Sequence, residues 1–211
     1  MNFLYFFVFI LKYYPTRDKI SYKTTLTEMN MKLLIASDIH GDFNCAKAVI
    51  DAFDTENCDK ILLLGDILYH GPRNDLPDGY NPKAVIELLN ANASKILAVR
   101  GNCDTEVDQM VLNFPILSDY CCLFLDGLTV YATHGHKFND VTPPPLCEGD
   151  ILIHGHTHVP KCVEFGNNNH CLNPGSVSIP KENSKKSYMI YENREFTLKD
   201  LDGNIIFDKK F

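Results

Sequence analysis

Short apolar runs alternate with amphipathic segments through the first half of the chain. The runs at 32–37, 60–64 and 95–99 have the length of buried strands, and each ends at a polar loop. Segments 44–53 and 82–93 carry apolar residues at helical spacing, the second with a proline in its first turn. This order of strands and helices predicts βαβ units and a parallel sheet.

From Tyr120 onward the pattern changes to short strand-like runs. Hairpin-like turn residues separate them at 126–127, 166–168 and 202–203. The second half is therefore expected to be rich in strands and poor in helices, which favours two sheets packed face to face and flanked by helices. The predicted strands are 120–125, 128–133, 150–153, 162–165, 187–191 and 196–198.

The N-terminal segment does not fit this pattern. Residues 1–11 are strongly apolar, but the run is too short to span a bilayer and no basic segment precedes it, so no signal peptide is expected. Residues 12–30 are polar and lack periodicity. We expect residues 1–30 to be an extension outside the fold and residues 31–211 to form the domain. A membrane-surface or partner-binding role for the extension is the alternative.

Composition narrows the class of protein. A chain of 211 residues with 45% hydrophobic residues is long enough for one soluble globular domain with its own core. The formal net charge of −7 argues against general nucleic-acid binding, which needs a basic face. The eight cysteines include no CxxC pair and no zinc-finger spacing, so we expect mostly buried, reduced thiols in a cytoplasmic protein without membrane association.

Histidine- and aspartate-bearing motifs follow the predicted strands. Segments 38–40, 65–66 and 101–104 come after the three strands of the first half, whose carboxyl ends share one edge of the sheet. Segments 134–136 and 155–158 add further histidines. Carboxylate, imidazole and amide groups are suitable donors for divalent metals, so the motifs together predict a two-metal phosphoesterase site.

Individual residues of these motifs can be assigned further. Asp66 is suited to bridge two ions because a carboxylate has two oxygens with several lone pairs. Asn102 offers a carbonyl oxygen to a metal, and its amide NH₂ could donate to a phosphoryl oxygen. Asp104 either orders the loop that presents Asn102 or is a surface turn residue. His154 is expected to be structural, and His170 is expected at the surface.

The motifs resemble those of the calcineurin-like metallophosphoesterases, and more narrowly those of the bacterial YfcE-type phosphodiesterases and their archaeal relatives. The resemblance runs from Met31 nearly to the C-terminus and includes segments 71–74, 100–104 and 173–178. It implies a four-layer αββα sandwich, in which helices cover two central sheets. It also implies a hydrolase that acts on a small phosphodiester, with a phosphomonoester or nucleotide phosphatase as the alternative.

The resemblance further implies two divalent metal ions that share Asp66. Manganese is the metal that it suggests, and the ligand types would also accept iron or zinc. A water or hydroxide that bridges two such ions has a pKa lowered towards about 7, so it can attack phosphorus at neutral pH without a protein base. One ion would be bound by Asp38, His40, Asp66 and His158, and the other by Asp66, Asn102, His134 and His156.

Cys103 departs from the wider superfamily, which usually has at this position a histidine thought to protonate the leaving group. A thiol has a pKa of about 8.5, and nearby cations favour the thiolate, so Cys103 is a poor candidate for the acid. We expect His136, or else His70 or water, to protonate the leaving group; a structural role for His136 beside the ligands is the alternative. Arg73 and His70 are the expected substrate contacts, although a loop arginine can simply be solvated.

A non-catalytic scaffold is the alternative from another class of protein, because the eukaryotic retromer subunit resembles this fold and has a compromised metal site. A scaffold of that kind predicts missing ligands. Here all seven ligand positions carry competent donors, which favours an enzyme. The C-terminal strands could pair across a two-fold axis, so a homo-oligomer is an open expectation.

Overall fold

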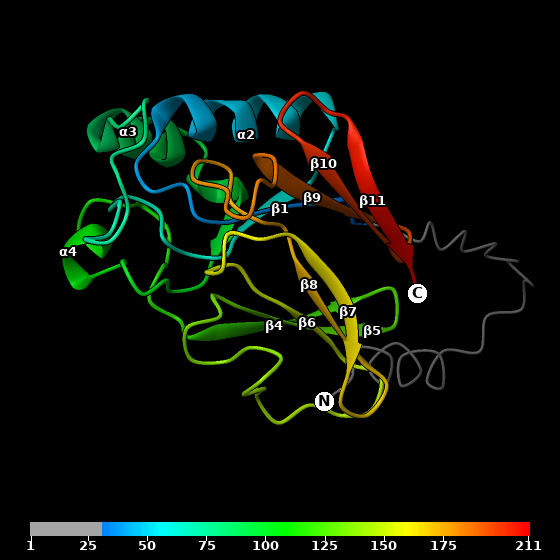
Figure 1. Cartoon of the computed structure of the whole chain (residues 1–211). Coiled ribbons are helices and arrows are strands. Elements are labelled where there is room, and N and C mark those ends of the chain that lie inside the picture. Colours follow the sequence, from blue (N-terminus) through cyan, green and yellow to red (C-terminus); the bar gives the residue numbers. More distant parts are fainter. Residues whose placement is uncertain (1–30) are drawn as a thin grey trace, which may run out of the picture.

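The computed structural model describes residues 31–211 (Figure 1). The expected extension, residues 1–30, lies outside the described residues. The described chain is a mixed α/β fold with two sheets and few helices, so the predicted fold class is confirmed. Among these residues, no helix is long and apolar enough to cross a membrane.

The first sheet has six strands in the order β11-β10-β9-β1-β2-β3. Its three N-terminal strands are parallel, and β9, β10 and β11 continue it as antiparallel neighbours. Strands β1 and β2 are buried on both faces, which explains their apolar runs, whereas Leu97 of the edge strand β3 is exposed. The strands are β1 (Leu33–Ala36), β2 (Lys60–Leu63), β3 (Ile96–Ala98), β9 (Ser187–Glu192), β10 (Glu195–Asp200) and β11 (Ile205–Lys210).

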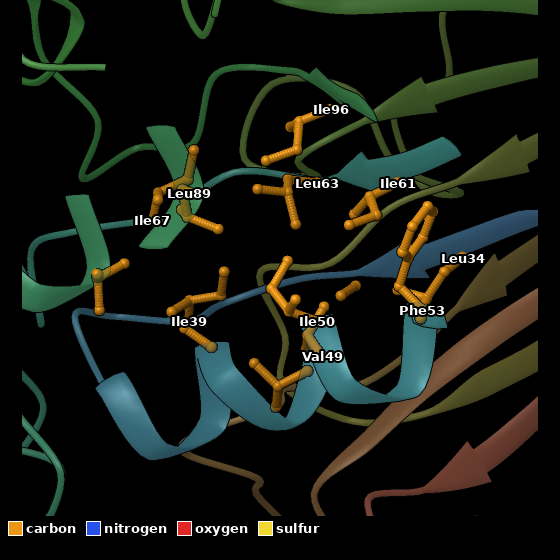
Figure 2. Close-up of a cluster of buried hydrophobic side chains, with 14 of the residues drawn as sticks. Leu34, Ile39, Val49, Ile50, Phe53, Ile61, Leu63, Ile67, Leu89 and Ile96 are labelled. Carbon is orange, nitrogen blue, oxygen red and sulfur yellow. The ribbon is translucent and has the colours of Figure 1, made fainter. Parts of the chain in front are cut away.

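Two helices cover the outer face of this sheet, α2 (Phe43–Thr55) and α3 (Pro82–Ala91) (Figure 1). The side chain of Asp42 accepts from the backbone N–H of Cys45 at the start of α2, which satisfies a free helix donor. Helix α2 packs on the sheet through an apolar cluster, which Figure 2 shows. Val49 and Phe53 come from the helix, and Leu34, Ile61 and Leu63 come from the strands.

The second sheet has five strands in the order β4-β5-β6-β8-β7. It packs against the inner face of the first sheet, where Leu33 and Leu62 lie in one apolar cluster with Val130, Ile151 and Leu172. This cluster places the ends of β1, β2, β5 and β6 near one another. The strands are β4 (Tyr120–Leu125), β5 (Leu128–Thr133), β6 (Ile151–Ile153), β7 (Lys161–Phe165) and β8 (Asn169–Asn173).

The structure also contains elements that the apolar pattern does not predict. Strand β8 has the polar sequence NHCLN, and β11 is an edge strand with exposed and charged residues. The short helix α4 (Glu106–Gln109) follows β3, and the predicted helix 82–93 ends at Ala91 before a 3₁₀ turn at Ala93–Lys95. His170 lies within β8 and is partly buried rather than fully exposed.

All eight cysteines are free thiols. Four of them are buried, three are partly buried and Cys147 is exposed. The prediction that most of the thiols pack in apolar surroundings agrees with the seven buried or partly buried ones, and Cys147 is the exposed exception.

Candidate metal centre

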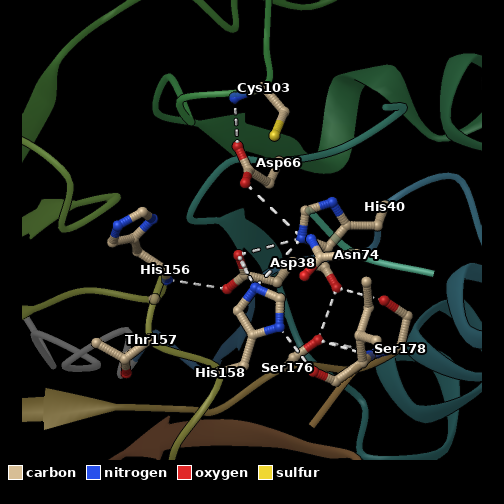
Figure 3. A network of polar contacts seen from close by, with 12 residues as sticks. Asp38, His40, Asp66, Asn74, Cys103, His156, Thr157, His158, Ser176 and Ser178 are labelled. Carbon is tan, nitrogen blue, oxygen red and sulfur yellow. Dashed lines mark hydrogen bonds and ion pairs between the residues drawn. The ribbon is translucent and has the colours of Figure 1, made fainter. Parts of the chain in front are cut away.

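The predicted ligands follow the carboxyl ends of strands from both sheets, and Figure 3 labels five of them, Asp38, His40, Asp66, His156 and His158. Loops after β1 and β2 supply Asp38, His40 and Asp66, and the loop after β3 supplies Asn102. The second sheet contributes His134 after β5, and His156 and His158 after β6. Contacts among these side chains bring together all seven residues.

The carboxylate of Asp66 lies between two histidines from different loops. Its Oδ2 is 3.4 Å from Nε2 of His134 and 3.7 Å from Nε2 of His40. Its other oxygen, Oδ1, accepts a hydrogen bond from the backbone N–H of Cys103 at 2.8 Å. One carboxylate oxygen therefore faces the rings of both halves of the site.

One half of the site is formed around Asp38. Its Oδ1 is 3.3 Å from Nε2 of His158 and 3.7 Å from Nε2 of His40, and the two ring nitrogens are 3.3 Å apart. The Asp38 side chain is fully buried, yet Oδ1 has no hydrogen-bond donor among the described residues. A cation would satisfy a buried carboxylate oxygen of this kind.

The other half is formed around His134. Its Nε2 lies 3.0 Å from Oδ1 of Asn102 and 3.2 Å from Nδ1 of His156. The backbone N–H of His156 donates to Oδ2 of Asp38 at 3.0 Å, so a hydrogen bond joins this half to the first.

Backbone carbonyls fix three of the rings. Nδ1 of His40, His134 and His158 lies within 2.7 Å of the carbonyl oxygens of Tyr69, Leu64 and Ile179, respectively. Each Nδ1 therefore carries the proton that it donates, and each Nε2 lone pair faces the carboxylates. Imidazoles that bind metals are oriented in the same way.

Charges within the site favour a cation. Burial opposes ionisation of Asp38, but the adjacent rings of His158 and His40 hold the pKa of its carboxyl well below the usual range. Burial disfavours the imidazolium of His134, yet Asp66 and Asp38 raise the pKa of this ring to about 9. Burial and the neighbouring His134 lower the pKa of His156 to about 4. Burial also opposes ionisation of Asp66, but His134 lowers the pKa of its carboxyl, so both carboxylates remain charged and create a negative potential.

The backbone is strained at most of the ligands. Asp38, His40, Asp66, His156 and His158 all have positive φ angles, between 49° and 66°. This left-handed region is uncommon for residues other than glycine, although Asp and His enter it more readily than most. Such strain persists only where the surrounding structure enforces it, and it is concentrated at functional sites.

Asp104 is one residue that enforces this geometry. Its buried carboxylate accepts from the backbone N–H groups of Asp66, Ile67 and Gly101, at 2.8, 2.9 and 2.7 Å. Burial raises the pKa of Asp104 to about 6 even though these three donors lower it. The residue therefore orders the loops of Asp66 and Asn102, and the alternative of a surface turn residue is wrong.

The segment 173–178 supports the remaining ligand loops. The hydroxyls of Ser176 and Ser178 both donate to the carbonyl oxygen of Asp38, at 2.9 and 2.7 Å (Figure 3). The amide of Asn173 donates to the carbonyl oxygen of Gly155 at 2.8 Å. The sequence analysis identifies segment 173–178 only through the resemblance to a known family. The pattern of apolar and polar residues does not predict that this segment hydrogen-bonds to the ligand loops.

A cavity of about 370 Å³ opens beside these ligands. Asp66, Asn102, His156 and His158 reach its wall, and so do Cys103 and the predicted substrate contact Arg73. Lys181 also lines it, a residue that the sequence analysis does not identify. In the part of the chain that the structure describes, neither Arg73 nor Lys181 forms an ion pair with a carboxylate.

Two predicted residues lie away from the cavity wall. His70 packs edge-on against Tyr69 and Tyr80, with ring centroids 4.7 and 5.4 Å away. The ring of His136 lies 5.4 Å from that of His134, and its buried Nδ1 has no hydrogen-bond partner among the described residues. His154 is buried, as expected of a structural residue, and its Nε2 is 3.5 Å from Asp140.

Comparison with known proteins identifies the family. The calcineurin-like phosphoesterase superfamily domain matches residues 31–195. This chain belongs to that superfamily. It is 47% identical to Phosphodiesterase YfcE of Escherichia coli K12 over 163 residues, which cover 77% of this chain and 88% of that protein. The predicted family and its YfcE-type subgroup are thereby confirmed.

Solved structures of the superfamily share the fold. A phosphoesterase from E. coli, YfcE, superposes with a TM-score of 0.82 at 44% identity, over 85% of this chain and 98% of that chain. Zinc-bound Vps29 from Entamoeba histolytica matches with a TM-score of 0.51 at 21% identity, over 85% of this chain and 97% of that chain. The second likeness concerns the fold alone.

Proposed function

We propose that this chain is a metal-dependent phosphodiesterase that hydrolyses a small phosphodiester at two divalent metal ions. The observation that carries the proposal is the position of Asp66, whose Oδ2 faces the Nε2 atoms of His40 and His134 at 3.7 and 3.4 Å. A carboxylate that faces ligands from two clusters is suited to bridge two ions. The 47% identity to a protein named Phosphodiesterase YfcE supports the reaction class.

The side chains fit such ions. Three Nε2 lone pairs, one amide oxygen and two carboxylates converge, and the buried Oδ1 of Asp38 lacks another partner in the described chain. Oxygen and imidazole donors are compatible with manganese, iron or zinc, and the family resemblance favours manganese among them. We assign Asp38, His40, Asp66 and His158 to one ion, and Asp66, Asn102, His134 and His156 to the other.

The ions, when bound, supply a hydroxide at neutral pH and neutralise charge on the phosphoryl group. The protein residues position the substrate. The amide oxygen of Asn102 faces His134, while its NH₂ lies beside Cys103 and can donate to a phosphoryl oxygen. Arg73 and Lys181 line the same cavity and add positive charge for the substrate's phosphate.

We further propose that His136 acts on the leaving group or positions His134. Burial raises the pKa of the Cys103 thiol, which makes it an even weaker acid. A His136→Ala variant should lose more activity on alkyl diesters than on aryl diesters, because alkoxide leaving groups need a proton more. Full activity of this variant on both substrates would remove His136 from the mechanism.

A phosphomonoesterase or nucleotide phosphatase is the second candidate function. It is favoured by the two cavity cations, Arg73 and Lys181, since a monoester carries more negative charge than a diester. A panel that compares bis(p-nitrophenyl) phosphate with p-nitrophenyl phosphate, with added manganese, decides between the two. The non-catalytic scaffold receives less support because every ligand position carries a donor side chain. An inactive manganese-loaded protein would favour it.

The remaining expectations are also proposals. Eight free thiols are consistent with the reducing cytoplasm, where a small soluble phosphoester is available as substrate.

The edge strand β11 exposes Ile205 and Ile206 and could pair with a second copy across a two-fold axis, which sedimentation would detect. If residues 1–30 are dispensable, their deletion leaves activity and solubility unchanged.

A further inference from the structure

A second hollow adjoins the metal cavity and plays no part in the chemistry described above. Its volume is about 400 Å³, and its walls are mainly apolar, formed by Leu68, Tyr69, Tyr80, Ile86, Val107 and Val111. We call it the apolar groove. Cys103 lines both the apolar groove and the metal cavity, so the two hollows meet at this residue.

The loops that hold the metal ligands also form the walls of the apolar groove. Leu68 and Tyr69 stand two and three positions after Asp66, and the carbonyl oxygen of Tyr69 fixes the ring of His40 at 2.7 Å. On the opposite side, Val107 lies in α4, a few residues after Asn102. The loops after β2 and β3 therefore form walls of the apolar groove as well as of the metal centre.

The surface of the apolar groove is suited to an apolar ligand. Tyr69 and Val111 are each 41% exposed and Val107 is 68% exposed, although they adjoin one another along this hollow. The polar residues beside them, Thr105 and Asp108, satisfy each other as the capping box at the start of α4. An exposed and mainly apolar surface favours a ligand that buries it, and the volume is in the range of small-molecule sites.

We infer that the apolar groove is the subsite for an apolar or aromatic ester group of the phosphoester. This inference rests on the proposed function, because the metal centre must hold the phosphate. The occupant is part of the substrate, since the groove shares the wall residue Cys103 and the ligand-bearing loops with the metal cavity. The enzyme therefore prefers phosphoesters that carry a ring-sized apolar group over those with a methyl group.

Calorimetry on the manganese-loaded full chain tests the inference with two phosphonates. Phenylphosphonate and methylphosphonate present the same anion to the metals, and only the first fills the groove. The wild type should bind phenylphosphonate about tenfold more tightly. A double variant, Val107→Ser with Val111→Ser, should lose most of this preference and keep its affinity for methylphosphonate.

Val141→Ser is the matched control, because Val141 is 84% exposed and lies outside the groove. It should keep the wild-type preference. Equal binding of both phosphonates by the wild type, or an unchanged preference in the double variant, overturns the subsite. Failure of both phosphonates to bind overturns the proposed function instead. If the double variant changes only the sedimentation of the protein, the groove is an interface between copies and the inference is wrong.

Discussion

The carboxylate of Asp104 accepts a hydrogen bond from the backbone N–H of Asp66 at 2.8 Å. Asp104 is not one of the predicted metal ligands, yet it holds the backbone of the shared ligand Asp66 in place. Its Oδ2 also accepts from Gly101, which precedes Asn102. A single buried side chain thus ties two ligand loops from neighbouring strands together. Residues of this kind are expected to affect metal affinity almost as strongly as the ligands themselves.

Substitution of Asp104 by asparagine should weaken both the fold and metal binding. The amide can replace only one carboxylate oxygen, and its NH₂ would face a backbone donor, so at least one buried N–H loses its acceptor. We expect the free energy of unfolding to fall by about 1–3 kcal/mol, and metal affinity to fall by about tenfold or more. Denaturant titration and metal analysis measure the two effects.

Asp119→Asn is the control for that substitution. Its carboxylate pairs with Lys137 at the surface, so its loss should change stability by less than about 1 kcal/mol. If Asp104→Asn behaves like this control, Asp104 does not order the site.

Metal binding should stabilise the folded protein, because the ligand geometry exists only there. At a concentration one hundred times the dissociation constant, manganese should add about 2.7 kcal/mol to the free energy of unfolding. Asp66→Ala should abolish most of this increase, because it removes the carboxylate shared by both ions. Thermal unfolding with and without manganese measures the difference. An equal metal response from Asp66→Ala would contradict the assignment.

Lys181→Ala should raise KM for a phosphodiester by about three- to fivefold, with kcat less affected, because an exposed lysine contributes modestly to anion binding. Steady-state kinetics provides the measurement. Lys83 is a matched control: it is an exposed lysine on α3 that does not line the cavity. Lys83→Ala should leave KM unchanged, and a similar increase in both variants would point to overall charge as the cause.

Asp200 should contribute to the acid sensitivity of the fold. Hydrogen bonds from Lys185 and Asn204 lower the pKa of its carboxyl to about 2, from an ordinary value of 3.8. The stabilisation is therefore complete above the ordinary pKa and is lost as the pH falls from about 4 through 2. Thermal unfolding across this range should show a shallower acid decline for Asp200→Asn than for the wild type. Parallel declines would contradict the prediction.

Much of the fold could be predicted because its central strands are buried on both faces. The run Leu33–Ala36 has only apolar residues, and that signal is independent of its partners in the sheet. The ligand loops after β1, β2 and β6 were also predictable, since each follows such a strand and carries histidine or aspartate. The same reasoning fails for β8, where Asn169 and Asn173 are buried but use their side chains to hold neighbouring backbone.

Other features depend on contacts between distant segments, which a single sequence does not disclose. Asp104 has the composition of a turn residue, and only the approach of the loop after β2 reveals it as a triple acceptor. Lys181 stands 115 positions after Asp66 in the chain, yet both line one cavity. The seven-residue ligand assignment remains a prediction, which metal analysis of the variants can test.

The left-handed backbone at five ligand positions has an evolutionary consequence. Glycine adopts that conformation without strain, whereas each aspartate or histidine there costs about 1–2 kcal/mol. In a lineage that no longer needed the metals, substitutions to glycine or asparagine at these positions would relieve the strain and are therefore expected to accumulate. A descendant that serves only as a scaffold should have glycine or asparagine at these positions, whereas this chain carries aspartate or histidine at all five.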